Sequence, residues 1–537
     1  MSESAKSILD SLDEDQAAAA SALRGPVCII AGPGSGKTRT ITHRIAYGVA
    51  TGVFNPDRVL ALTYTNRAAA EIRSRLRQIG THSVAVRTFH SAALSQLQFF
   101  WPQLTGSPAP KLLTNKRSLI SEVAQLQGVK LSDSQVSDVV GEIEYLKYSL
   151  TELPAYFEQG RIPSYLSQEQ FAGLVERYQE QKLQRRLMDW EDTLLLTTGL
   201  LRNEPRLLSH FQQQYRFFTV DEYQDISPLQ EGLLRTWLGE REEICVVGDP
   251  RQTIYSFAGA TSSFLLEFAN VHSETAVFEL NKNYRSGTEI VHSANRVLPA
   301  SPLQAVREFS GRVERVEFSS AAAEAEGVAK KISGSGQVKL SDIAILARTN
   351  QQLSAFEVEL TKRGIKSQVR GQGRFFRQPL VAQAINAIRA LTVSNSSEPL
   401  FIELSKILTS LGWQSQPRAD ENWESLNWFF TVLDELGEPS LAEYIRELDE
   451  RERSGHEPTR EAVTLATVHG TKGLEWKDVY LVGLNRGLFP ISHSTSEQDL
   501  AEERRLFYVA ITRAKDFLHL SHFSEQSEFL TALDSRN

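Results

Sequence analysis

The sequence predicts an α/β protein with two parallel-sheet cores, each interrupted by a mainly helical insertion. Three observations carry this prediction. Short apolar runs of strand length alternate with helical segments at the start of the chain and again in two later regions. Between these regions the apolar runs stop while helical patterning continues. The chain has 537 residues, which is too long for a single hydrophobic core.

The first core is expected to span residues 1–95 and 205–280, with a helical insertion at residues 96–204. We expect helices at residues 116–127 and 168–184 and no parallel-sheet strand within this insertion. The expected strands of the core are the apolar runs at residues 27–30, 59–62, 84–86, 217–220, 244–247 and 276–280.

The second core is expected to span residues 281–379 and 460–537, with a short helical insertion at residues 380–459. Its expected strands are residues 313–318, 343–346, 463–466 and 479–482, and its insertion contains expected helices at residues 380–391 and 440–451. Small and polar residues at 333–336 and 453–458 are typical of linkers.

Composition and charge are those of an ordinary globular protein, with 41% hydrophobic and 23% charged residues. A net charge of −8 argues against a histone-like polycation, although a local groove can still bind single strands through positive charge and stacking. Cys28 and Cys245 each lie in an apolar run, which indicates core residues and not a disulfide or a metal site. We see no signal peptide and no long apolar span, so we expect a cytoplasmic protein with no membrane partner.

A glycine-rich loop at residues 31–38 is the strongest local signal. It follows an apolar run and precedes a helical segment at residues 39–49. Small residues let backbone N–H groups cradle phosphate oxygens, while Lys37 reaches the β- and γ-phosphates and Thr38 contacts Mg²⁺. The alternative is a glycine turn that happens to precede Lys-Thr. The expected nucleotide-binding residues here are Ala31, Gly32, Pro33, Gly34, Ser35, Gly36, Lys37 and Thr38, with Ala31 in place of the usual glycine.

Two later strands end in polar residues that suit nucleotide hydrolysis. Asp221 follows one strand and can hold Mg²⁺, and the adjacent Glu222 can act as general base toward water. The alternative is a solvated carboxylate pair at a strand end. Gln252 follows the next strand and can bond the γ-phosphate or the attacking water, and Tyr255 and Phe257 are either base-stacking faces or core residues.

The ordered set of motifs resembles that of superfamily 1A DNA helicases of the UvrD/Rep/PcrA type. The resemblance covers both cores and implies that each is a RecA-like P-loop core. Besides the segments above, the matching segments are residues 12–16, 62–71, 87–90, 188–192, 280–286, 347–350, 467–476 and 502–514.

The resemblance implies that ATP and Mg²⁺ bind between the two cores. Gln16 would read the adenine edge, and Tyr284 would stack on the adenine opposite Arg39. Arg285 and Arg513 would reach the γ-phosphate as arginine fingers. The implied catalytic residues are Lys37, Glu222, Gln252, Arg285 and Arg513, and Glu475 joins the residues that bind the nucleotide.

The resemblance also implies contacts to single-stranded DNA. Some would be stacking faces and others backbone contacts, whereas each residue alone would more often be a core aromatic or a loop histidine. The implied DNA contacts are Thr63, Tyr64, Asn66, His90, Trp190, Tyr255, Phe257 and His469.

Three departures from the family pattern bear on activity. The segment Phe257-Ala258-Gly259-Ala260 lacks the arginine that usually follows the aromatic residue. The second insertion is short. After residue 518 the last strand leads almost directly into a helix, without the β-hairpin that separates strands in the family.

The resemblance implies an ATP-dependent DNA helicase that moves 3′-to-5′ on single strands and unwinds duplexes in repair or replication. The expected partners are single-stranded DNA, strand junctions and repair or replication proteins, and the chain is expected to be a monomer or weak dimer. Three alternatives stay open: a translocase that displaces proteins with little unwinding or needs a partner, a module that binds ATP and DNA without turnover, and an enzyme acting on RNA.

Overall fold

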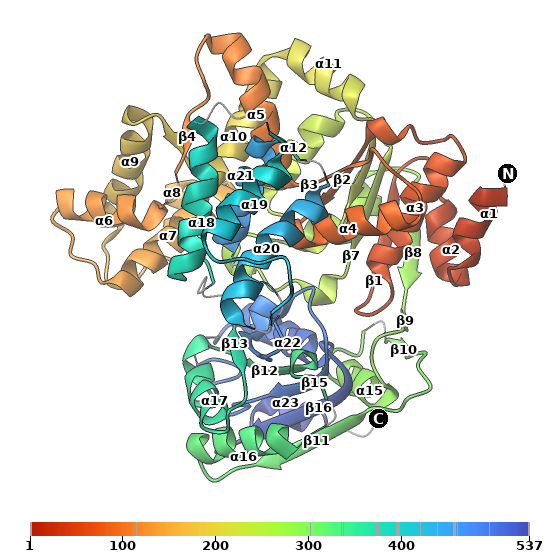
Figure 1. Cartoon of the computed structure of the whole chain (residues 1–537), viewed down its shortest axis with the longest axis vertical. Helices are drawn as coiled ribbons and strands as arrows, with labels where there is room; N and C mark the ends of the chain where they lie inside the picture. Colours follow the sequence, from red (N-terminus) through yellow and green to blue (C-terminus); the bar gives the residue numbers. More distant parts are fainter. Residues whose placement is uncertain are drawn as a thin grey trace. The chain divides into compact units, whose positions relative to one another are not determined.

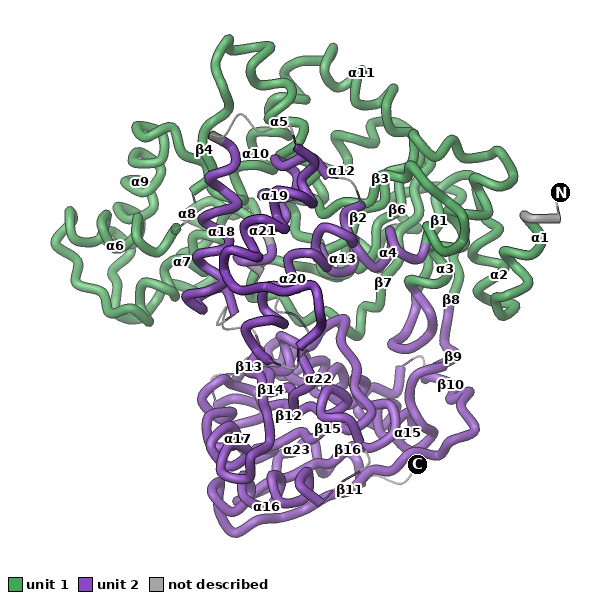
Figure 2. The backbone as a smooth tube through the Cα atoms, in the orientation of Figure 1, with its two compact units in different colours: residues 1–30, 38–64, 76–279 green, residues 31–37, 65–75, 280–537 purple. Residues whose placement is uncertain are grey.

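The structure is a computed structural model that describes residues 3–113, 115–300, 302–334, 336, 338–370, 375–393, 398–418, 420–437, 439–454, 458, 460–492 and 494–534. The chain forms two compact units (Figure 2). Unit 1 contains residues 1–30, 38–64 and 76–279, and unit 2 contains residues 31–37, 65–75 and 280–537. The predicted α/β class with two parallel sheets is confirmed. The boundaries of the two cores and two insertions stay a prediction.

The first sheet has six strands in the order β3-β2-β6-β7-β1-β8. The pairs β2–β3, β2–β6, β6–β7 and β1–β7 are all parallel. Its central strands are apolar and buried, as expected for a sheet covered on both faces. The strands are β1 (Val27–Ala31), β2 (Val59–Thr63), β3 (Ala85–Thr88), β6 (Phe217–Val220), β7 (Ile244–Gly248) and β8 (Ala276–Leu280).

Helices dominate the rest of unit 1, and Figure 1 shows α6, α7, α8 and α9 gathered away from strands β1, β2 and β3. Many of these helices begin at a capping box, for example Ser132 with Gln135 at α7 and Asp189 with Asp192 at α10. The helices are α1 (Glu3–Asp10), α2 (Glu14–Ser21), α3 (Lys37–Ala50), α5 (Phe89–Thr105), α6 (Lys116–Leu126), α7 (Asp133–Ser149), α8 (Leu153–Glu158), α9 (Gln168–Gln184), α10 (Trp190–Asn203), α11 (Pro205–Gln214), α12 (Pro228–Leu238), α13 (Ser263–Leu266) and α14 (Phe268–Val271). Helix α4 (Asn66–Gln78) crosses from unit 2 into unit 1.

One expectation for the first insertion is wrong. Strand β4 (Lys111–Leu112) pairs in parallel with β5 (Leu187–Met188), so this region does contain parallel strands. Two-residue strands are too short to give a periodic apolar run, and their pairing joins segments far apart in the sequence. The pair places β5 directly before the start of α10.

The second sheet also has six strands, in the order β11-β16-β15-β12-β14-β13, and every adjacent pair is parallel. Helices α16 and α17 pack on its core residues, and α15 and α22 contact each other and β16. Its strands are β11 (Arg312–Glu317), β12 (Ile343–Ala347), β13 (Ser367–Val369), β14 (Val463–Thr467), β15 (Trp476–Leu481) and β16 (Ala514–His522), and β9 (Lys282–Asn283) pairs separately with β10 (Gln304–Ala305).

The remaining helices of unit 2 include a bundle between β13 and β14 that has its own apolar cluster. Its members are α18 (Pro379–Ala390), α19 (Leu400–Ser410), α20 (Glu421–Leu436) and α21 (Leu441–Ser454). The other helices are α15 (Thr288–Val297), α16 (Ala321–Gly334), α17 (Asn350–Lys362), α22 (Glu497–Ile511) and α23 (Glu528–Ala532).

The two linker-like tracts fall partly on these helices. Residues 333–334 end α16 and residues 453–454 end α21, so these parts are helical. Residues 335, 455, 456 and 457 lie outside the described residues. Over the part of the chain that the structure describes, no helix has the length and apolar character needed to span a membrane.

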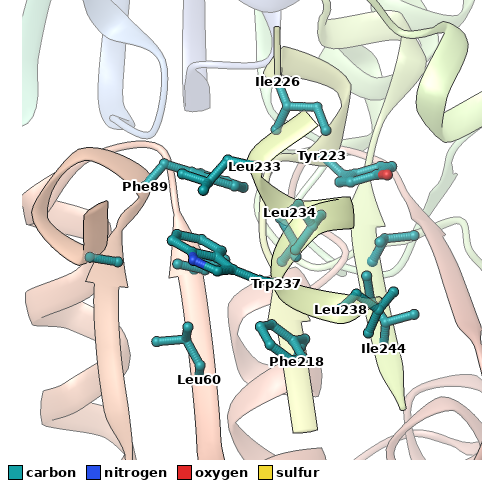
Figure 3. Packing of buried hydrophobic residues seen from close by; sticks show 14 of the residues in the cluster. Leu60, Phe89, Phe218, Tyr223, Ile226, Leu233, Leu234, Trp237, Leu238 and Ile244 are labelled. Atoms are coloured by element: carbon teal, nitrogen blue, oxygen red, sulfur yellow. The ribbon is translucent and has the colours of Figure 1, made fainter. Parts of the chain in front are cut away.

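The core of unit 1 is organised around Trp237 on α12 (Figure 3). This ring is fully buried and lies nearly parallel to Phe89 at 6.1 Å and to Phe211 at 5.3 Å between centroids. Its indole N–H donates to the side-chain oxygen of Gln96 at 3.0 Å. Trp237 therefore joins α5, α11 and α12 in one cluster.

We expect Trp237→Ala to destabilise unit 1 by about 3–5 kcal/mol, because the substitution leaves a large cavity. Thermal unfolding followed by circular dichroism would show a lower midpoint. The control is Leu183→Ala on α9, whose side chain is 81% exposed and whose loss should change stability by less than about 0.5 kcal/mol. Equal midpoints for the two variants would contradict this account of the core.

Candidate functional site

Polar segments follow the strands of the first sheet at a single edge. Because these strands are parallel, the loops after β1, β2, β3, β6 and β7 all leave from the carboxyl edge. Crevices at this edge are where open α/β sheets bind ligands. The sequence motifs at residues 32–38, 64–66, 89–90, 221–225 and 249–257 all follow these strands.

The glycine loop after β1 has the backbone shape of a phosphate cradle. Gly34 and Gly36 have φ values of +71° and +82°, which other residues rarely adopt. The Ser35 hydroxyl donates to the Gly32 carbonyl at 2.7 Å, and α3 begins at Lys37. Positive backbone dipoles at a helix start attract phosphate, so the loop fits a nucleotide.

Within unit 2, the loop is tied to residues 280–286. The Gly32 N–H donates to the Leu280 carbonyl at 3.1 Å, and the Tyr284 N–H donates to the Gly34 carbonyl at 2.9 Å. The Asn283 amide donates to the Pro33 carbonyl at 2.7 Å, and its oxygen accepts from the Arg285 N–H. A Cβ atom on Gly34 would lie 2.7 Å from the Cβ of Arg285. Glycine is thus required twice over, by φ and by space.

Asn283 was not predicted as a site residue, although it is almost fully buried and its side chain bonds to Pro33 and to the backbone of Arg285 and Ser286. The neighbouring Tyr284 is 40% exposed. Asparagine before an exposed aromatic residue and an arginine is the only local signal of this role. Its partner Pro33 lies 250 residues away, which no local pattern reveals.

The acidic residues after β6 form one hydrogen-bonded network with the loop after β7. The Gln224 amide donates to the Glu222 carboxylate at 2.6 Å, and the Gln224 oxygen accepts from the Asp249 N–H at 3.0 Å. The Gln252 amide donates to the Asp249 carboxylate at 2.9 Å. Asp221 accepts from the Glu222 N–H at 3.0 Å. The structure therefore brings together three predicted residues, Asp221, Glu222 and Gln252.

Gln224 and Asp249, the bridging residues of this network, were not predicted as site residues. Both are fully buried, and Gly248 is needed because a Cβ there would lie 2.4 Å from the Gln224 side-chain oxygen. Glu222 has a φ of +54°, an uncommon conformation that often marks a functional residue. Both residues follow apolar strands, and this pattern is the sequence signal that could have predicted the hydrogen bond between Gln224 and Asp249.

The two expected arginine fingers in unit 2, Arg285 and Arg513, have different partners: a carboxylate for Arg285 and backbone carbonyls for Arg513. The Arg285 guanidinium lies 2.5 Å from the Glu475 carboxylate, which also contacts Lys515 at 2.7 Å. Burial opposes ionisation of Glu475, but Arg285 and Lys515 hold its pKa below the usual value, so it stays charged. Arg513 is buried and donates to the carbonyls of Val509 and Leu474 at 3.0 and 3.1 Å.

Gln16 and Arg39 both lie in unit 1, close to the first helices. Gln16 is buried, and its side-chain oxygen accepts from the Asp13 N–H in the capping box of α2. Arg39 on α3 donates to the Ser11 carbonyl at 2.6 Å. Thr38, on the first turn of α3, accepts through its carbonyl from Thr42.

Aromatic side chains from two loops gather at the carboxyl edge of unit 1. Tyr64 and Tyr255 stack with centroids 5.5 Å apart, and Phe257 lies edge-on to Tyr255 at 6.2 Å. Tyr64 is 40% exposed and Phe257 is 55% exposed. Such faces suit base stacking, which tolerates any sequence.

Two polar side chains near this edge lack hydrogen-bond partners among the described residues. They are the Thr63 hydroxyl and the Asn66 amide nitrogen, and both are buried. An unsatisfied buried polar group is costly, so its presence points to a ligand or water that completes it. Both residues were expected to contact DNA.

His90 and Trp190 are less accessible than a stacking role requires. Trp190 packs in an apolar cluster with Leu94, Leu97 and Met188, and it lies edge-on to His90 at 5.9 Å. Both rings are buried. Their contact with DNA stays a prediction, and little of either side chain is exposed to solvent.

His469 is in unit 2, where burial and the charge of Arg348 lower its pKa to about 3. The imidazole is therefore neutral at pH 7 and can only donate or accept a hydrogen bond. Arg348 itself forms a two-pronged ion pair with Glu503, with contacts of 2.7 to 3.1 Å.

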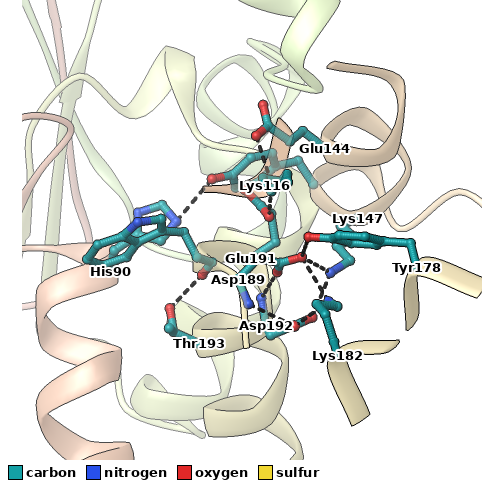
Figure 4. Close-up of polar contacts among 12 residues, drawn as sticks. His90, Lys116, Glu144, Lys147, Tyr178, Lys182, Asp189, Glu191, Asp192 and Thr193 are labelled. Carbon is teal, nitrogen blue, oxygen red and sulfur yellow. Dashed lines mark hydrogen bonds and ion pairs between the residues drawn. The ribbon is translucent and has the colours of Figure 1, made fainter. Parts of the chain in front are cut away.

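A buried ionic cluster lies beside Trp190 in unit 1 (Figure 4). Asp189 accepts from Lys147 at 2.6 Å, from Lys182 at 2.8 Å and from the Tyr178 hydroxyl at 2.9 Å. Both lysines also contact Asp192. Burial disfavours the charge on Asp189, but the surrounding lysines hold its pKa well below the usual value.

The described residues contain no group of three or more His, Cys, Asp or Glu side chains arranged to hold a metal ion. Magnesium needs no such group, because it keeps several waters and uses one or two protein oxygens plus phosphates. Thr38 and Asp221 supply oxygen donors of that kind.

We expect Asp189→Asn to destabilise unit 1 by about 3–5 kcal/mol at pH 7, because two buried lysines lose a charged partner. The folded-state pKa of Asp189 lies below its unfolded value, so its stabilisation is present above about pH 4 and is lost as the pH falls further. The gap in melting temperature between this variant and the unaltered chain should therefore narrow below about pH 4. Glu122→Gln, which breaks an exposed pair with Arg185, is the control and should change little. A gap that is constant with pH would contradict the prediction.

Comparison with known proteins agrees with this geometry. The family model described as the UvrD/REP helicase N-terminal domain matches residues 12–273, and the UvrD-like helicase C-terminal domain matches residues 278–414 and 393–525. The chain is 39% identical to the ATP-dependent DNA helicase UvrD2 of Mycobacterium tuberculosis, over 97% of this chain and 80% of that protein. It is 27% identical to the ATP-dependent DNA helicase PcrA of Bacillus subtilis, over 97% and 84% of the two chains. The chain therefore belongs to the UvrD-like DNA helicase family.

Proposed function

We propose that this protein is an ATP-dependent DNA helicase that translocates 3′-to-5′ on single-stranded DNA and couples ATP hydrolysis to duplex unwinding in repair or replication. The observation that carries the proposal is the network joining Glu222, Gln224, Asp249 and Gln252 at the same sheet edge as the glycine loop. The network supports the proposal because P-loop proteins use a carboxylate and an amide for hydrolysis.

The P-loop residues have separate roles in this proposal. The backbone N–H groups of residues 32–36 hold the phosphates, and Lys37 neutralises charge on the β- and γ-phosphates. Glu222 accepts a proton from the attacking water, and Gln252 orients that water or the γ-phosphate. Mg²⁺, held by Thr38 and through water by Asp221, would supply charge neutralisation on the phosphates.

Residues of unit 2 complete the proposed chemistry. Arg285 and Arg513 neutralise charge that develops on the phosphoryl group, as arginine fingers do. The contacts of Arg285 with Glu475 at 2.5 Å and with the Thr512 carbonyl at 3.2 Å hold its guanidinium beside the motif that carries Arg513. Tyr284 offers its exposed ring to the adenine, and Gln16, Arg39 and Glu475 contact the base and sugar.

The proposed DNA contacts combine stacking with hydrogen bonds. Tyr64 and Phe257 offer exposed rings, and Tyr255, which stacks with Tyr64, is a further stacking contact. The unsatisfied Thr63 and Asn66 groups suit phosphate or sugar oxygens. None of these groups selects a base sequence. His90, Trp190 and His469 are retained as further contacts.

A second candidate function is translocation with little unwinding, or unwinding that needs a partner. Strand β16 ends at His522 and α23 begins at Glu528, and the residues between them form no paired hairpin. A helicase without a strand-separating hairpin can still move along a single strand. RNA is also retained as a substrate, since stacking and phosphate contacts do not distinguish the sugars.

The cellular setting belongs to the same proposal. We place the protein in the cytoplasm, acting as a monomer or weak dimer on single strands and strand junctions, with repair or replication proteins as partners. A module that binds ATP and DNA without turnover is disfavoured, because Lys37, Glu222, Gln252 and the two arginines are all present.

The first test is ATP-driven unwinding of a 3′-tailed duplex, with a 5′-tailed duplex and Lys37→Ala as controls. We expect only the 3′-tailed duplex to open, and the variant to lose ATP hydrolysis by 100-fold or more, on the order of other lost charge-stabilising groups. Hydrolysis stimulated by single-stranded DNA without opening of either duplex would favour the translocase. Stimulation by RNA alone, or no hydrolysis at all, would overturn the proposal.

A second test addresses the arginines. We expect Arg285→Ala to lower kcat for ATP hydrolysis by about 10³-fold or more, as for other arginine fingers, while the protein stays folded. Arg312→Ala is the matched control, because Arg312 is 67% exposed and its charge pairs with Glu314 on the same strand, β11. A loss of less than tenfold for Arg285→Ala would argue against its direct action on phosphate.

A further inference from the structure

Helix α7 ends beside the residues proposed to contact DNA. The Tyr148 hydroxyl lies 3.1 Å from Nε2 of His90, and the two rings are edge-on with centroids 6.0 Å apart. His90 in turn lies edge-on to Trp190 at 5.9 Å. All these residues belong to unit 1. Tyr148 was not among the residues predicted from the sequence.

The residue before Tyr148 fixes this helix end to the start of α10. Lys147 contacts Asp189 at 2.6 Å and Asp192 at 2.7 Å, and Asp189 is the N-cap residue directly before Trp190. Figure 4 shows His90 on one side of the Asp189–Asp192 segment and Lys147 on the other. A ring of contacts therefore joins the end of α7 to the starts of α5 and α10. It runs through Lys147, Asp189, Trp190, His90 and Tyr148.

The loop that carries Phe257 packs on the same helix end. Gly259 has a φ of +88°, and a Cβ atom there would lie 3.2 Å from the Tyr148 Cβ and from the Ser149 nitrogen. Arg161, which lies over the Tyr145 ring at 3.6 Å, donates to the Phe257 carbonyl at 3.2 Å. The end of α7 thus contacts the segments of His90, Trp190 and Phe257 together.

We propose that Tyr148 is a positioning residue for single-strand binding, which rests on the function proposed above. Its hydroxyl fixes the orientation of the His90 ring, and its Cβ and backbone lie against Gly259 in the loop that carries Phe257. Lys147 holds Tyr148 in register by anchoring α7 to buried carboxylates. Tyr148 itself touches neither ATP nor the reacting atoms.

Tyr148→Phe tests this directly, because it removes one hydroxyl and keeps the ring. The matched control is Tyr145→Phe, one turn earlier on α7, whose hydroxyl donates to Gln159 at 3.1 Å away from His90. ATP hydrolysis is measured against increasing oligothymidylate, and both variants are checked by thermal unfolding. We expect the half-saturating oligothymidylate concentration of Tyr148→Phe to rise roughly three- to tenfold, the effect of one lost hydrogen bond.

The readouts separate positioning from stability. The proposal requires that the maximal rate of ATP hydrolysis falls by a smaller factor in Tyr148→Phe than the half-saturating oligothymidylate concentration rises. It also requires that Tyr145→Phe has a similar melting temperature and shows no rise in that concentration. Equal curves for the two variants, while the unaltered chain is stimulated by oligothymidylate, would overturn the role of Tyr148 alone. If oligothymidylate does not stimulate the unaltered chain, the proposed function fails and this role fails with it.

Discussion

Parallel pairing in the first sheet is the constraint on which the candidate site depends. Strands β1, β2, β3, β6 and β7 run in one direction, so every loop that follows them leaves from the same edge. Reversing any one strand would send its loop to the opposite edge. Strands β1, β2, β6 and β7 are apolar and almost entirely buried, and their continuous apolar runs fix which segments form the centre of the sheet. The chemistry of the site is thus decided by the packing of Val, Ile and Leu residues that never touch a ligand.

A single buried amide links the acidic residues to the neighbouring loop. Gln224 donates to Glu222 and accepts from the backbone of Asp249, so one side chain determines the position of two loops. Glu222 adopts a left-handed backbone conformation, which persists only where surrounding contacts hold it. Because Gln224 is fully buried, its hydrogen bonds are not weakened by competition with water. Rigidity at this point keeps the carboxylate of Glu222, the proposed general base, in one orientation.

Sequence patterns predicted the elements better than the contacts between them. Continuous apolar runs such as β6 and β7 were found because strand length and turn residues are local signals. The two-residue pair β4–β5 has no such signal and was missed. An apolar strand that ends in two carboxylates led to Asp221 and Glu222, whereas Asn283 and Gln224 act through hydrogen bonds to distant residues. Burial also limits prediction of the site, because the sequence does not show whether an aromatic residue such as Trp190 lies in a core or on the surface.

The proposed function requires a chain with a net charge of −8 to bind the polyanion DNA, and stacking offers a way to do so. Exposed rings at Tyr64 and Phe257 provide stacking energy that does not depend on net charge. The neutral His469 and the unsatisfied Thr63 hydroxyl, both proposed DNA contacts, can add uncharged hydrogen bonds. Ionic contacts to phosphate weaken as the salt concentration rises, because each one releases counterions when it forms. Binding through stacking and neutral hydrogen bonds, as proposed for this chain, depends less on salt than binding through ionic contacts.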